Sequence, residues 1–192
     1  MSNVQKGRLR KSLLFLNDRS AFFKELIKDI EKLIRDCEKQ GKLPAVRLNG
    51  TSDLRWEKIK FEGQTILERF PQVQFYDYTK NPNRFKDLPA NYHLTYSFNE
   101  LTPLDTARKV LDNKGNVAVV FRNEIPKQFL AKNNPLLVNT SRYKVIDGDK
   151  HDLRFLDGSG VIVGLTAKGP AKKDTSGFVV DWTDADTRSC NI

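Results

Sequence analysis

The chain has 192 residues, of which 39% are hydrophobic and 30% are charged. A chain of this length buries enough surface to form a hydrophobic core, and this composition excludes a generally disordered protein. Lys and Arg outnumber Asp and Glu by 33 to 24, which gives a net charge of +9 and favours anionic partners such as nucleic acid, nucleotide or phosphate. A basic, solvated surface without such a partner would have the same composition.

Cysteine usage and hydropathy exclude two further classes of protein. The chain contains only two cysteines, Cys37 and Cys190, so it builds neither a disulfide framework nor a CxxC metal site. No run of about 18 apolar residues is present, and the basic amino terminus is not followed by the apolar stretch of a signal peptide. We therefore expect a cytoplasmic protein with no membrane association.

The first half of the chain predicts a basic arm followed by alternating helices and strands. Four cations, Lys6, Arg8, Arg10 and Lys11, make residues 1–12 a basic arm and a candidate contact for nucleic acid. Apolar residues three and four apart predict a helix over 20–40, which Gly41 ends. The segments that follow are a strand over 45–48, a helix over 59–70 and strands over 73–78 and 92–98.

The second half continues the alternation. A helix is predicted from Thr102 or Asp105 to Leu111, followed by the strand 117–121, which is apolar throughout and is typical of a strand buried on both faces. A helix over 126–132, strands over 145–146 and 161–165, and an edge strand over 178–182 follow. The pattern predicts an α/β fold, a mostly parallel sheet of about six strands with flanking helices, either open or curled into a partial TIM-barrel-like form. We expect one domain over 13–182 and a disordered tail over 183–192.

Polar residues follow most of the predicted strands, at the edge where α/β folds bind ligands. Solvated loops are also polar, so the alternative is that this edge holds no site. The candidate ligand-binding residues are Asn49, Thr51, Asp53, Asp77, Thr79, Lys80, Ser97, Asn99, Arg122, Asp147, Asp149, Lys150, His151, Asp152 and Lys168.

Two kinds of chemistry fit these residues. Asp147, Asp149 and His151 are candidate ligands of a divalent metal ion, although Asp-Gly is also a common turn. The cations that follow strand ends fit phosphate or carboxylate, or neutralise neighbouring aspartates; they are Lys80, Arg122, Lys150 and Lys168. The aromatic residues of the strands fit base stacking or the core. The sequence has no Walker loop, dinucleotide fingerprint or nucleophile elbow.

Seven segments resemble a family of phage proteins, the gene product eighty-eight-like group. They are GRLRKSLLFLNDRSAFF, VRLNGTSDLRWE, FYDYTK, YHLTYSFNE, VAVVFR, VIDGDKHDLRFLD and VIVGLTAKG. The resemblance implies a radical-SAM-like α/β barrel of viral origin, with ligand contacts at the strand ends, in the host cell cytoplasm. Longer relatives carry cluster-binding cysteines upstream of the GRLRK segment. Since Cys37 and Cys190 cannot supply three or four thiolates, an iron–sulfur cofactor is not supported by this chain.

These observations favour a non-catalytic binding protein over an enzyme. The expected partner is nucleic acid, a nucleotide or a host protein complex, such as a host-defence complex. The alternatives are a metal-assisted enzyme acting on a nucleotide-like or phosphate-bearing substrate, an iron–sulfur enzyme if a cysteine segment precedes Met1, and a structural module of a virion. The sequence indicates neither a certain cofactor nor an oligomeric state.

Overall fold

The computed structural model describes residues 2–125 and 143–181. The chain divides into two compact units. Unit 1 comprises Met1–Leu48, Leu54–Phe75 and Pro89–Tyr92, and unit 2 comprises Asn49–Asp53, Tyr76–Leu88 and His93–Ile192. The expectation of one domain over 13–182 stays a prediction.

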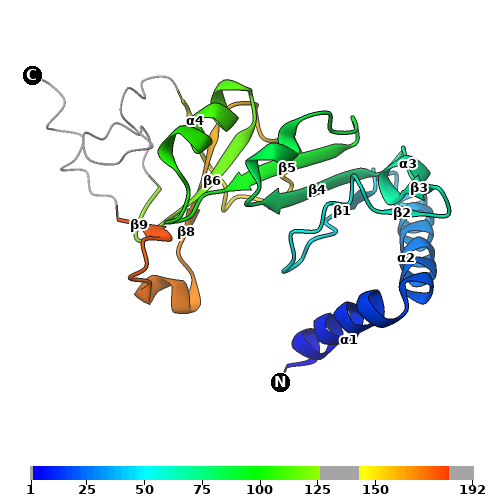
Figure 1. Cartoon of the computed structure of the whole chain (residues 1–192). Coiled ribbons are helices and arrows are strands. Elements are labelled where there is room, and N and C mark those ends of the chain that lie inside the picture. The colour runs from blue at the N-terminus through cyan, green and yellow to red at the C-terminus, as the bar shows by residue number, and fades with distance from the viewer. Residues whose placement is uncertain (1, 126–142, 182–192) are drawn as a thin grey trace, which may run out of the picture. The chain divides into compact units, whose positions relative to one another are not determined.

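Two consecutive helices form the amino-terminal part of unit 1, α1 (Asn3–Asn17) and α2 (Arg19–Lys39), drawn in blue in Figure 1. Helix α1 starts with a capping box, in which Ser2 Oγ accepts from Gln5 N and Gln5 Oε1 accepts from Ser2 N. Asp18 lies between the helices and caps α2 by accepting from Ala21 N at 2.9 Å. The predicted helix over 20–40 is confirmed, whereas the helical structure of the basic arm was not predicted.

Aromatic rings form the core of unit 1. The rings of Phe23 and Phe61 stack at 4.8 Å with an interplanar angle of 3°. Trp56 is buried and contacts Phe15, Phe22 and Phe23 with ring centroids 6.1 to 6.3 Å apart. Aromatic pairs of this kind add stability beyond the area that they bury.

The helix predicted over 59–70 is wrong for most of its length. A hairpin replaces it, in which β2 (Lys60–Phe61) pairs antiparallel with β3 (Gln64–Thr65). The two turn residues have positive φ, 51° at Glu62 and 83° at Gly63, which a helix does not allow. Only the last turn is helical, α3 (Ile66–Arg69), where Thr65 and Glu68 form a second capping box.

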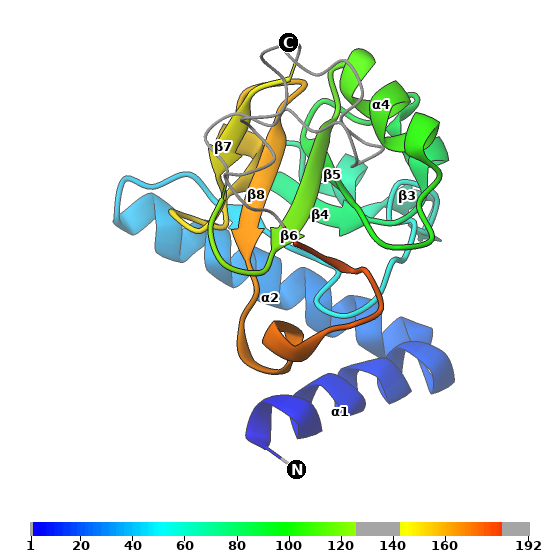
Figure 2. The same cartoon turned by 90° about the vertical axis from the view of Figure 1, so that its left-hand side faces the viewer.

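Within residues 2–125 and 143–181, the main sheet has seven strands. They are β1 (Ala45–Val46), β4 (Gln74–Thr79), β5 (Tyr92–Ser97), β6 (Asn116–Phe121), β7 (Val145–Asp147), β8 (Ile162–Thr166) and β9 (Val179–Val180). The order is β1-β4-β5-β6-β8-β7, with β9 also paired to β6. The pairs β1–β4, β5–β6, β6–β8, β6–β9 and β7–β8 are all parallel. Figure 2 shows β6, β8 and β7 side by side.

The mostly parallel α/β sheet is therefore confirmed, and each predicted strand overlaps an observed one within the described residues. The described sheet does not close on itself, because its order ends at β1 and β7, and the partial barrel stays a prediction. The predicted helix over 126–132, Trp182 and the tail over 183–192 lie outside the described residues. Among the residues described, no helix combines the length and apolar character needed to cross a membrane.

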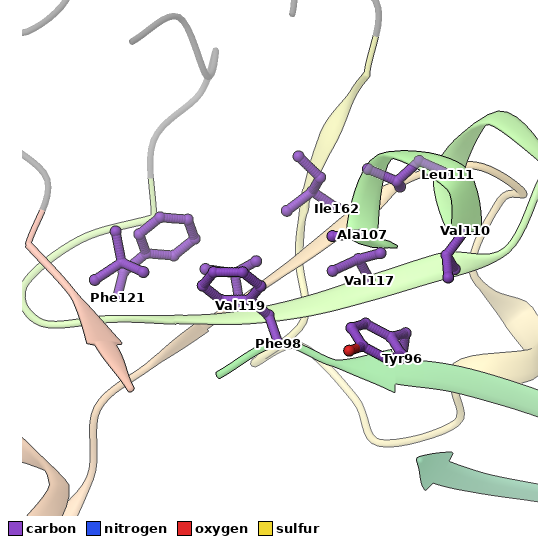
Figure 3. Packing of buried hydrophobic residues seen from close by; sticks show 10 residues of the cluster. Tyr96, Phe98, Ala107, Val110, Leu111, Val117, Val119, Phe121 and Ile162 are labelled. Atoms are coloured by element: carbon purple, nitrogen blue, oxygen red, sulfur yellow. The ribbon is translucent and has the colours of Figure 1, made fainter. Parts of the chain in front are cut away.

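Helix α4 (Leu104–Asp112) covers one face of the sheet in unit 2, which we call the outer face. Figure 3 shows Ala107, Val110 and Leu111 of this helix beside Val117 and Ile162 of β6 and β8. The opposite, inner face carries a second apolar cluster of Ala118, Val161 and Val163. Strand β6 thus has buried side chains on both faces, as its apolar sequence predicts. Short 3₁₀ helices connect the strands: η1 (Pro82–Phe85), η2 (Arg154–Leu156) and η3 (Gly169–Lys173).

Candidate functional site

Asp53 is the centre of a polar cluster at the carboxyl end of β4. Its Oδ2 accepts from Thr79 Oγ1 at 3.0 Å and from the backbone N–H of Lys80 at 2.8 Å. Its Oδ1 lies 2.5 Å from Nη1 of Arg84, whose side chain is fully buried in η1. The structure therefore brings Asp53 together with Thr79 and Lys80, two predicted residues from a different segment of the sequence.

A second carboxylate, Asp77 of β4, contacts the loop 49–53, which also contains Asp53. Its side chain is fully buried and accepts from the backbone N–H of Asn49 at 2.7 Å and from Asn49 Nδ2 at 3.3 Å. Asn49 Oδ1 accepts in turn from Ser52 Oγ at 2.8 Å. Hydrogen bonds to Asp77 and Asp53 thus hold the loop 49–53 at the end of β4, and Thr51 is exposed on this loop.

Arg122 follows β6 and binds the segment around η3 and β9. Its guanidinium pairs with the carboxylate of Asp181 and donates to the carbonyl oxygens of Lys172 and Asp174, each at 2.8 Å. The hydrogen bond to Asp181 raises the pKa of Arg122 above its ordinary value. The Arg122 side chain, which the sequence predicts to bind an anionic ligand, thus binds oxygen atoms of the protein itself. Another predicted residue, Ser97, is half-buried at the end of β5.

Asp149 joins the ends of β7 and β8. Its Oδ2 accepts from the backbone N–H and the hydroxyl of Thr166 at 2.9 and 2.6 Å, and its Oδ1 accepts from Lys168 Nζ at 2.8 Å. Partial burial alone would raise the pKa of Asp149, but the hydrogen bonds from Lys168 and Thr166 together lower it below its ordinary value. Two further predicted residues, Asp149 and Lys168, are therefore directly paired.

A cavity of about 630 Å³ lies at the ends of β6, β7 and β8, and we call it the rim cavity. Its charged lining residues are Glu124, Asp147, Asp149 and Lys150, so carboxylates outnumber cations. Three of the four are residues that the sequence predicts for a ligand site. The lining favours a ligand with hydrogen-bond donors or positive charge over a phosphate group.

The structure does not bring the predicted metal ligands together. Across residues 2–125 and 143–181, no group of three or more His, Cys, Asp or Glu side chains is placed to hold a metal ion. Asp147 Oδ1 accepts from Asp149 N at 3.0 Å, and Asp149 is paired with Lys168. His151 lies near Asp157 instead, with its Nε2 3.9 Å from Asp157 Oδ1.

Two buried arginines were missed by sequence reasoning. Arg84 in η1 and Arg154 in η2 are both about 1% exposed or less, although arginine is rarely fully buried. Arg154 Nη2 donates to the carbonyl oxygens of Gly148 and His151, and its Nε lies 3.4 Å from Asp157 Oδ2. Neither position carries a sequence signal of burial, because each lies in a polar loop.

The predicted basic arm lies on α1 with all four cations exposed. Arg10 pairs with Glu25 of α2 at 3.3 Å. Unit 1 contains sixteen Lys and Arg and nine Asp and Glu, a net charge of +7 out of +9 for the whole chain. The positive charge is therefore concentrated in the smaller unit.

Comparison with known proteins identifies a family for this chain. A family model described as Gene product 88 matches residues 1–182. The match spans the Asp53 cluster, the rim cavity and helix α1. No curated protein and no solved structure matches the chain.

Proposed function

This chain belongs to the Gene product 88 family of phage proteins, and we propose that it binds nucleic acid through the helices of unit 1. The observation that carries the proposal is the charge of that unit, +7 out of +9 for the chain. A local excess of cations attracts the phosphate backbone and releases its counterions, which supplies most of the affinity in non-specific binding. The radical-SAM-like barrel and the anti-defence role stay predictions.

Helix α1 carries its cations where the helix macrodipole does not favour them. Lys6, Arg8, Arg10 and Lys11 all lie in its first nine positions, and its first turn contains no acidic residue. The amino-terminal end of a helix is the positive end of its macrodipole, so cations there destabilise the helix. A phosphate backbone along α1 would compensate both the macrodipole and the side-chain charges.

Fluorescence anisotropy with labelled single-stranded and double-stranded oligonucleotides tests the proposal. We expect binding at low salt and a linear fall of log K with log salt concentration, with a slope of about −0.9 for each phosphate neutralised in duplex DNA. The triple variant Lys6→Ala, Arg8→Ala, Lys11→Ala should bind more weakly, and its slope should be smaller by about 2 to 3. Circular dichroism checks that α1 remains helical, which alanine favours.

A matched variant controls for the loss of net charge. Lys150→Ala, Lys172→Ala, Lys173→Ala removes three exposed cations from unit 2, and it should retain wild-type affinity and slope. Equal losses in the two triple variants would show that only the net charge of the chain matters and would contradict a site on α1. No binding by the wild-type chain at low salt would end the nucleic-acid proposal and leave a protein partner.

A further inference from the structure

Buried polar side chains gather on the inner face of the sheet in unit 2. Thr95 of β5 and Asn116 of β6 are paired neighbours in the parallel ladder, so their side chains lie on the same face. His93 precedes Thr95 by two residues and shares its face, and so does Ala118 of the inner apolar cluster, two residues after Asn116. Thr95 and Asn116 are 0% and 1% exposed, and Nε2 of His93 is buried.

Arg154 lies against the same face. A Cβ added at Gly148 would come within 2.7 Å of Arg154 Nη1 and 2.5 Å of Cγ1 of the inner-face residue Val163. Burial first, and then the positive charge of Arg154, lower the pKa of His93. Phe155, the next residue, packs on Tyr76 of β4 with ring centroids 5.4 Å apart.

These residues also share unmet hydrogen-bonding capacity. In the part of the chain that the structure describes, six buried side-chain atoms have no hydrogen-bond partner. All six belong to the inner-face cluster, defined as His93, Thr95, Asn116, Arg154 and Asp157. Two of the six, Arg154 Nε and Asp157 Oδ2, face each other at 3.4 Å as an ion pair. Buried polar atoms are nearly always hydrogen-bonded in native proteins, so the other four, on His93, Thr95, Asn116 and Arg154, favour a group that binds there.

The chemistry of the six atoms selects the class of ligand. Arg154 Nε, Arg154 Nη1 and Asn116 Nδ2 only donate, whereas Thr95 Oγ1 and His93 Nε2 either donate or accept. Asp157 Oδ2 is the one carboxylate oxygen among them, and it lies 3.4 Å from Arg154 Nε. Donors therefore predominate, and a ligand rich in acceptor oxygens satisfies most of them.

We propose that the inner-face cluster binds a small oxyanion, a carboxylate or a phosphate, with Arg154 as the charged anchor and Thr95 and Asn116 as hydrogen-bonding partners. The six atoms are shielded from solvent. A ligand therefore reaches them when the segment 148–157, which carries Arg154 and Phe155, moves away from the sheet. This site lies in unit 2 and is independent of the nucleic-acid surface proposed for unit 1.

Isothermal titration calorimetry of the full chain with inorganic phosphate and with acetate tests the site. We expect one equivalent of one of these anions to bind, and the anion that binds decides between the phosphate and carboxylate classes. The same titration is made with the Lys6→Ala, Arg8→Ala, Lys11→Ala variant, in which the cluster is intact. Retained binding there separates this site from anion binding on α1.

Two variants of the cluster test whether its side chains bind the anion. Thr95→Val keeps the shape of the side chain and removes one hydroxyl, and it should weaken binding roughly three- to tenfold. Arg154→Met should abolish binding. Thr102→Val makes the same change at another buried threonine of unit 2, outside the cluster, and should bind like the wild type.

Two results would overturn the proposal. One is the absence of binding by both anions in the wild-type chain. The other is wild-type affinity in Thr95→Val, a variant that does not depend on whether Arg154→Met folds.

Discussion

The carboxylate of Asp53 lies 2.5 Å from Nη1 of Arg84, a side chain with no exposed surface. The two residues are 31 positions apart, Asp53 in the loop 49–53 and Arg84 in the 3₁₀ helix η1. Asp53 is about one-third exposed and also accepts from Thr79 and Lys80. One carboxylate thus neutralises a buried cation and connects the loop 49–53 to η1 and to the end of β4. A buried charge that loses its partner is strongly destabilising.

Replacing Asp53 by Asn tests this relationship. The variant keeps the size of the side chain and removes its charge, so we expect a loss of about 3 kcal/mol in the free energy of unfolding, measured with urea. Glu100→Gln removes an exposed carboxylate from the same unit and should change stability by less than about 0.5 kcal/mol. A loss below that limit in Asp53→Asn would mean that Arg84 does not depend on Asp53.

Two buried threonines should respond in opposite ways to the same substitution. Thr79 Oγ1 donates to Asp53 and accepts from the backbone N–H of Asn81, so Thr79→Val should lose about 1 to 3 kcal/mol of stability. Thr95 Oγ1 is buried without a hydrogen-bond partner among the described residues. Thr95→Val should be neutral or stabilising by up to about 1 kcal/mol in the absence of a ligand. Parallel urea titrations compare the two, and equal losses would be inconsistent with this assignment.

Gly148 should tolerate no side chain. A Cβ there would lie 2.5 Å from Val163 Cγ1, 2.7 Å from Arg154 Nη1 and 2.9 Å from the backbone oxygen of Gly164. Because a backbone atom is among the contacts, Gly148→Ala should be destabilising by about 1 to 3 kcal/mol, measured by thermal or urea unfolding. Gly158→Ala is the control, since its Cβ would meet only Val161 Cγ1 at 3.7 Å.

We expect the protein to lose stability in mild acid because the pKa of His93 is lowered. Burial and the charge of Arg154 lower its pKa below the ordinary value of 6.5, so the unfolded chain binds the proton more tightly than the folded one. Its contribution to stability is complete above about pH 6.5 and falls as the pH decreases below it, by at most about 1.4 kcal/mol per pH unit. Unfolding between pH 7.5 and 5.5 measures the effect. His93→Gln should flatten this dependence, whereas an unchanged slope in that variant would assign it to other groups.

The sequence by itself determined the elements whose signals are local. Helix α2 has apolar residues three and four apart, and residues 117–121 of β6 are an uninterrupted apolar run. Such patterns predict an element because only its own residues must repeat at the right spacing. The alternation of these elements was sufficient to predict the mostly parallel sheet and a polar edge at its strand ends.

Only the tertiary structure decided where the polar and charged side chains are buried. The hairpin over 60–65 replaced a predicted helix because Glu62 and Gly63 adopt positive φ and Phe61 stacks on Phe23, a residue 38 positions earlier. Arg84, Arg154 and Thr95 have ordinary sequence surroundings, and their burial depends on neighbours from distant segments. The free energy of a buried polar group is set by the partners that surround it, and those partners meet only when the chain is folded.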